Sequence, residues 1–169
     1  LQRSGVGPGA WLREFDIPAT VYLATYYTDF QHPVFDPACA YVIWKGRDRG
    51  SCDAVGLTGD APQPPLLVST PDERAASTSR ILRHAEDAKL SGMDKELLLR
   101  ELAARLGVDY GRIRDRRLLY QMSADEVRAL PRDLVQVELH THRHRTPGNA
   151  GLFAREIDDN RRRISELTG

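Results

Sequence analysis

The chain has 169 residues, a length that fits one domain with its own core, because chains of this size bury well over half of the surface they expose when unfolded. Lysine plus arginine and aspartate plus glutamate each number 24, so the formal charge is zero and no overall field favours nucleic acid or anionic lipid. Cys39 and Cys52 match no metal-binding or redox pair, and no apolar run approaches the roughly 20 residues of a membrane helix, so we expect two ordinary thiols and no membrane segment.

The N-terminal part predicts a loop, a helix end and a strand. Glycine and proline in residues 1–10 favour a loop, and we expect this segment to be disordered or a non-native start. Residues 11–16 are typical of the last turns of a helix. Residues 19–25 are rich in β-branched and aromatic side chains, which predicts a buried strand.

The middle of the chain is mostly helical by its capping signals. A short helix is expected over 36–44, and a weakly patterned excursion leads to a short strand at 66–68. Thr70 and Glu73 form the ends of a capping box with a proline at the first helical position, and Ser123 and Glu126 repeat the box. The predicted helices run over 71–89, 91–107, 109–118 and 124–130.

The C-terminal part returns to a strand and a helix. Residues 134–139 predict a second strand, and 151–167 predict a terminal helix with Leu152, Ile157, Ile164 and Leu167 on one side. Strand and helix alternate at both ends of the chain, which favours an α/β fold with parallel strands in one domain over 1–169, interrupted by a helical insertion at about 46–120.

Three of the five histidines follow the second strand directly, in the run 138–145. Neutral imidazole is the commonest protein ligand for a catalytic divalent metal. The two-residue period of a strand places His140 at the strand's C-terminal end, the edge where α/β folds carry their active sites. His140 and His144 are four residues apart and can reach one ion if the loop bends into a helical turn, whereas His142 points elsewhere.

A simpler interpretation is a solvated basic loop, since Arg143 and Arg145 alternate with the histidines and could hold a phosphate. A catalytic zinc ion usually takes three protein ligands and one water, so two histidines do not complete a site. The position immediately after a strand, with Thr141 between the histidines, favours the metal.

Four stretches resemble the polysaccharide deacetylases, which share the homology domain of nodulation chitooligosaccharide deacetylases. His140-Thr141-His142-Arg143-His144 is similar to their second motif, His-Ser/Thr-x-x-His. The segment 15–23 resembles the family's second strand, 122–130 resembles the helix that leads to the metal-binding strand, and 153–169 resembles the helix that follows it.

This resemblance implies a partial distorted (β/α) barrel with a helical insertion and the hydrolysis of an acetyl group on a polysaccharide or glycan. It implies one divalent ion, Zn2+ by preference, held by an aspartate and by histidines that match His140 and His144, with Thr141 bracing the loop. Tyr26 and Tyr27 follow the first strand at the same edge and are candidates for a carbohydrate subsite.

The first family motif, which supplies the base and the aspartate ligand, has no match, and neither has the third. We therefore expect the base upstream of Leu1 and an inactive fragment as the chain stands. Asp29, Asp36 and Asp158 are acidic candidates, each interpreted as a surface carboxylate. Tyr41 and Trp44 could line a sugar subsite, but helical spacing favours core packing.

Two other classes of function remain open at this point. One is a carbohydrate-binding or assembly module that keeps the fold without catalysis. The other is an anion-binding loop at 140–145 that is unrelated to metal. The sequence assigns neither a compartment nor an oligomeric state.

Overall fold

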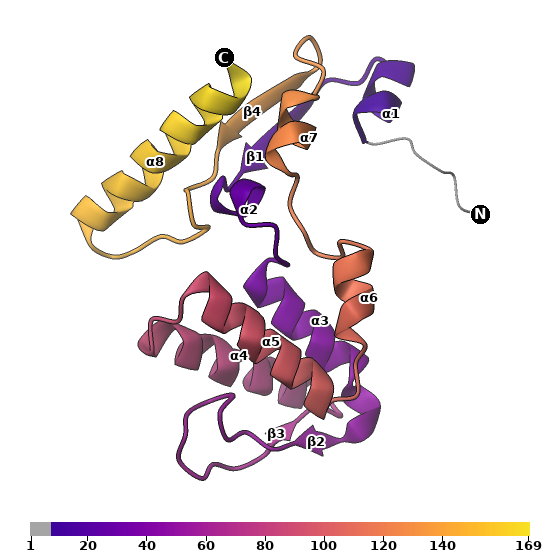
Figure 1. Cartoon of the computed structure of the whole chain (residues 1–169), viewed down its shortest axis with the longest axis vertical. Coiled ribbons are helices and arrows are strands. Elements are labelled where there is room, and N and C mark those ends of the chain that lie inside the picture. The colour runs from indigo at the N-terminus through magenta and orange to yellow at the C-terminus, as the bar shows by residue number, and fades with distance from the viewer. Residues whose placement is uncertain (1–7) are drawn as a thin grey trace. The chain divides into compact units, whose positions relative to one another are not determined.

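The computed structural model describes residues 8–169, which fall into two compact units (Figure 1). The terminal unit consists of Leu1–Gln31 and Gln121–Gly169, and the central unit is His32–Tyr120. The expected loop at 1–7 lies outside the described residues. Residues 8–10 are helical instead of looped, since a proline is well tolerated in the first turn of a helix.

The terminal unit is built around two parallel strands. Strand β1 (Ala19–Leu23) pairs with β4 (Val135–Leu139) in the register Ala19↔Val135 to Leu23↔Leu139. Short helices α1 (Pro8–Glu14), α2 (Tyr26–Asp29) and α7 (Ala124–Arg128) and the long helix α8 (Ala150–Thr168) complete the unit. The predicted parallel direction of the two strands is therefore confirmed.

One face of this sheet is buried and the other is open. Leu23, Val127, Ile164 and Leu167 form the core of the unit, where α8 packs along β4 and α7 (Figure 1). The expectation that the first strand is buried is only half right. Tyr22 is 65% exposed, because alternate residues of a strand point to opposite faces and only one face has a partner layer.

The central unit is a small helical cluster. Helix α3 (Phe35–Lys45) packs against α4 (Pro71–Asp87) and α5 (Gly92–Arg105), and α6 (Tyr110–Asp115) follows. A 3-10 turn at Arg47–Arg49 precedes β2 (Ser51–Cys52), which pairs antiparallel with β3 (Leu66–Leu67). The helix starts expected at Thr70 and Ser91 are confirmed, and Asp109 caps α6. Trp44 is 45% exposed, so its predicted place in the core is wrong.

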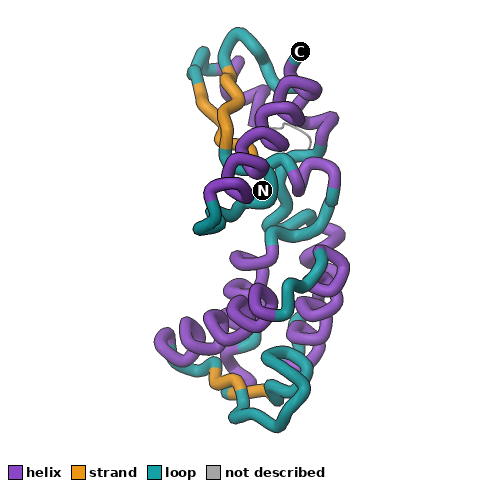
Figure 2. Tube along the Cα trace, turned by 90° about the vertical axis from the view of Figure 1, so that its left-hand side faces the viewer, coloured by secondary structure: helices purple, strands orange, loops and turns teal. Residues whose placement is uncertain are grey.

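The fold class is mixed α/β, with 52% helix and 9% strand. Figure 2 shows the two strand pairs in orange, one in each unit. Residues 8–169 contain no closed barrel. Among the described helices, none has the length and apolarity needed to cross a bilayer.

Candidate functional site at the ends of the parallel strands

The histidine loop lies where the two parallel strands end. Because β1 and β4 run in the same direction, Thr25 and His140 leave the sheet at the same edge. The backbone N–H of Tyr26 donates to the carbonyl of His142 at 2.8 Å, and the N–H of His142 donates to the carbonyl of Glu156 at 3.0 Å. The loop is thus attached to α2 on one side and to α8 on the other.

The imidazoles of His140 and His144 are neighbours. Their ring centroids are 4.8 Å apart with an interplanar angle of 56°, and both residues are exposed. Thr141 and His144 have φ angles of 59° and 56°, the left-handed region that residues other than glycine rarely adopt. The Oγ1 atom of Thr141 accepts a hydrogen bond from the N–H of Arg145 at 3.1 Å. This bend brings the two rings to one place.

Tyr22 borders the His140 ring on the open face of the sheet. The two ring centroids are 6.4 Å apart and tilted by 60°. Tyr26 and Tyr27, the candidates for a carbohydrate subsite, lie on α2 and contact each other edge to face at 5.3 Å. Tyr26 also stacks on Phe30 at 4.7 Å, so one face of its ring is already covered.

His142 is held apart from the histidine pair. Its Nδ1 atom lies 2.9 Å from the Oγ1 of the buried Thr25, whose hydroxyl already accepts a hydrogen bond from Asn160. A hydroxyl group can donate one hydrogen bond and accept two, so this contact forms with the imidazole proton on either ring nitrogen. Burial and, secondly, the charge of Arg143 lower the pKa of His142 below its ordinary value of 6.5.

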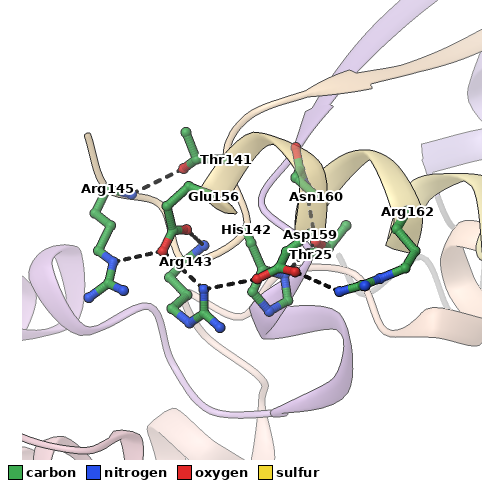
Figure 3. A network of polar contacts seen from close by, with 9 residues as sticks. All are labelled: Thr25, Thr141, His142, Arg143, Arg145, Glu156, Asp159, Asn160 and Arg162. Atoms are coloured by element: carbon green, nitrogen blue, oxygen red, sulfur yellow. Dashed lines mark hydrogen bonds and ion pairs between the residues drawn. The ribbon is translucent and has the colours of Figure 1, made fainter. Parts of the chain in front are cut away.

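Asn160 of α8 connects the ends of both strands, and Figure 3 shows its contact with Thr25. Its side chain is fully buried, and its Oδ1 accepts a hydrogen bond from the backbone N–H of His140 at 2.8 Å. Its Nδ2 donates to the carbonyl of Leu23 at 2.9 Å and to Thr25 Oγ1 at 3.0 Å. One amide thereby fixes the point at which the histidine loop leaves the sheet.

Glu156, one turn earlier on α8, holds the other end of the loop (Figure 3). The residue is 1% exposed; its Oε2 accepts from the backbone N–H of Arg143 at 2.7 Å, and its Oε1 accepts from Arg143 Nη1 at 3.0 Å and Arg145 Nε at 2.8 Å. Burial raises the pKa of this carboxyl. The hydrogen bonds from Arg143 and Arg145 together lower the pKa by more than burial raises it, so the net pKa is below its usual range.

Sequence reasoning did not find Glu156 or Asn160. The signal was nevertheless present in the sequence. Helical spacing places Glu156 and Asn160 on the same face of the helix as the apolar residues Ile164 and Leu167. Polar side chains on a buried stripe need partners, and here the partners are the groups of the histidine loop.

The acidic candidates have other partners. Asp29 binds Arg163, with 3.0 Å between Oδ2 and Nε, and Asp158 binds Arg161 at 3.0 Å on the exposed side of α8. Asp36 lies in α3 of the central unit. Within residues 8–169, no group of three or more histidine, cysteine or acidic side chains could hold a metal ion. The described site therefore offers two imidazole donors, which suit a divalent transition metal in chemistry but not in number.

Comparison with protein-family models, with curated proteins and with solved structures finds no match to this chain.

Proposed function

We propose that this chain is part of a metal-dependent hydrolase that removes acetyl groups from a polysaccharide or glycan, of the polysaccharide deacetylase type. The observation that carries the proposal is the adjacency of the His140 and His144 rings at the C-terminal edge of a parallel strand pair. In this proposal the two histidines are ligands of one divalent ion, Zn2+ by preference, and β1 and β4 are two strands of a distorted (β/α) barrel.

The donor set supports part of a catalytic metal site. His140 and His144 would hold the ion, which would supply polarisation of the acetyl carbonyl and a lowered pKa of bound water. Because such sites usually have three protein ligands, the proposal assigns the third ligand and the general base to residues outside 8–169. The described residues position the pair: Asn160 fixes the backbone of His140, and Thr141 and Glu156 fix the loop up to Arg145.

The contacts of the two loop arginines argue against an anion-binding loop. Both guanidinium groups bind the buried carboxylate of Glu156, and Arg143 also lies 3.5 Å from Asp159. Both cations are therefore directed toward α8, where they share the carboxylate of Glu156. A phosphate would have to compete with a carboxylate that is already in place.

Zinc titration of the 169-residue chain by calorimetry tests the metal pair. We expect Zn2+ binding to weaken by about tenfold or more in His140→Ala and in His144→Ala, since each variant removes one of two ligands. His84→Ala, a single histidine on α4, is the matched control and should leave binding unchanged. Equal zinc affinity in all four proteins would reject the assignment.

A second experiment separates an enzyme from a binding module. A form of the chain extended upstream is assayed for acetate release from an acetylated chitooligosaccharide, with and without a chelator. Release that stops with the chelator and in His144→Ala supports the hydrolase. Sugar binding that is indifferent to the chelator, with no acetate released, points to the module and overturns the enzymatic proposal.

A further inference from the structure

The central unit has a pocket of about 410 Å³, remote in sequence from the histidine loop. Helix α3 contributes Tyr41 and Lys45 to its wall, and the segment around α6 contributes Val108, Arg112 and Arg116. This volume lies within the range of pockets that accept small molecules, about 300–1,000 Å³.

The rim of this pocket carries an excess of positive charge. Lys45, Arg112 and Arg116 line it together with one carboxylate, Asp109, whose Oδ1 accepts the backbone N–H of Arg112 at 3.1 Å. In the part of the chain that the structure describes, none of the three cationic groups forms a salt bridge. The adjacent Arg114, by contrast, lies 3.1 Å from Asp115.

The spacing of the two arginines favours an anion between them. Arg112 and Arg116 are four residues apart, the separation that brings side chains together on one helical face, so their like charges repel. A planar guanidinium presents paired N–H groups that match two oxygens of a phosphate or a carboxylate. A bound anion would therefore offset the repulsion between Arg112 and Arg116 and accept hydrogen bonds from both guanidinium groups.

The same pocket is also lined by apolar side chains. Ile113 is 2% exposed, and Tyr41, Val108 and Leu118 pack partly buried against the core of the central unit. Lys45 Nζ lies 5.9 Å from the centre of the Tyr41 ring, so a cation stands beside an aromatic face. Apolar and aromatic side chains beside polar or charged groups that fix the orientation of a ligand are typical of small-molecule sites.

We propose that this pocket binds a small sugar that carries a phosphate or carboxylate group, with Arg112 and Arg116 on the anion and Tyr41 beside the ring. The proposal does not depend on the metal pair, because it uses only residues of the central unit. It would give the chain a second binding site, for a small anionic carbohydrate.

Calorimetry on the 169-residue chain, in low-salt buffer with a chelator, compares glucose 6-phosphate, glucuronate, glucose and inorganic phosphate. We expect glucose 6-phosphate or glucuronate to bind more tightly than both glucose and inorganic phosphate. Which of the two anionic sugars binds shows whether the pocket prefers a phosphate or a carboxylate. Arg112→Gln and Arg116→Gln should each weaken that binding by about tenfold, the usual worth of a charge-assisted hydrogen bond.

Arg114→Gln is the matched control, because it removes the same charge from the same short helix outside the pocket lining. Circular dichroism shows whether each variant is folded, and the exposed positions of Arg112 and Arg116 favour intact folding. The proposal is overturned if neither anionic sugar binds at millimolar concentration, if glucose binds equally well, or if Arg114→Gln loses as much affinity as the pocket variants.

Discussion

The substitution Glu156→Gln tests whether the buried carboxylate holds the histidine loop. Glutamine keeps the shape of the side chain and one acceptor oxygen. Its NH2 group replaces the other oxygen and cannot accept a hydrogen bond, so at least one of the three hydrogen bonds is lost. A hydrogen bond to a charged group contributes about 1.5–3 kcal/mol and a neutral one about 0.5–1.5 kcal/mol. The side chains of Arg143 and Arg145 are 39% and 60% exposed, and water replaces much of what they lose. Whichever way the amide is turned, the charge-assisted bond to the Arg143 N–H is lost or becomes a neutral one, and we expect a loss of about 1–2 kcal/mol.

The measurement is urea unfolding at pH 7, with hydrogen exchange of the Arg143 amide as a local probe. Asp158→Asn is the control, because this residue pairs with Arg161 on the same helix and both side chains are mostly exposed. Such a surface pair contributes about 0–1 kcal/mol, so the control should change the free energy of unfolding little.

The pH dependence supplies an independent check. The folded pKa of Glu156 is below its ordinary value of 4.5, so its stabilisation is present above pH 4.5 and is lost as the pH falls through the folded pKa. The difference between wild type and Glu156→Gln should shrink accordingly in acid. A difference no larger than that of Asp158→Asn, or one that stays constant in acid, would refute the role of this carboxylate.

Three further predictions concern single positions. Asn160→Ala should cost about 2–4 kcal/mol in urea unfolding, because it leaves buried backbone and hydroxyl groups without partners; a cost below 1 kcal/mol would contradict this. Gly46→Ala should cost about 1–3 kcal/mol, because its new Cβ would lie 2.5 Å from Leu106 Cβ, whereas Gly148→Ala, with no atom within 4 Å, should be neutral; equal Tm values for the two would oppose the packing argument. His142 has a lowered folded pKa, so wild-type stability should fall as the pH drops below 6.5, and His142→Gln should remove that part of the slope in unfolding measured across pH 5–7; an unchanged slope would show that another group titrates.

The local signals of the sequence predicted most of the helices and their starts. Capping boxes depend on side chains within four residues of one another, so Thr70, Ser91 and Ser123 mark helix starts without any tertiary information. The parallel direction of β1 and β4 also followed from element order, because a strand that returns in the same direction needs a long connection, but their direct pairing was not predicted.

What the sequence did not predict depends on contacts between distant residues. Tyr22 is exposed because no second layer covers that side of the described sheet. The alternation of side chains along a strand shows that the strand has two faces but does not show whether both are covered. The exposure of Trp44 reflects the direction in which α3 packs on α4 and α5. Glu156 and Asn160 were overlooked because a polar residue at core spacing suggests a surface until its partners are known.

The backbone of the histidine loop explains why α8 matters for the proposed metal pair. Thr141 and His144 occupy the left-handed region, which costs a residue with a side chain about 1–2 kcal/mol. A short loop on its own would relax out of that conformation and separate the two rings. Asn160 accepts a hydrogen bond from His140, and Glu156 accepts from Arg143 and Arg145. Both acceptors lie on the long helix α8, so these bonds oppose the relaxation of the loop. Strained backbone that surrounding contacts maintain is common at functional sites. The unfavourable backbone conformation is tolerated there because it places a side chain in a required position. The conformation at Thr141 and His144 is therefore a second reason, beside ring proximity, to look for chemistry at this edge of the sheet.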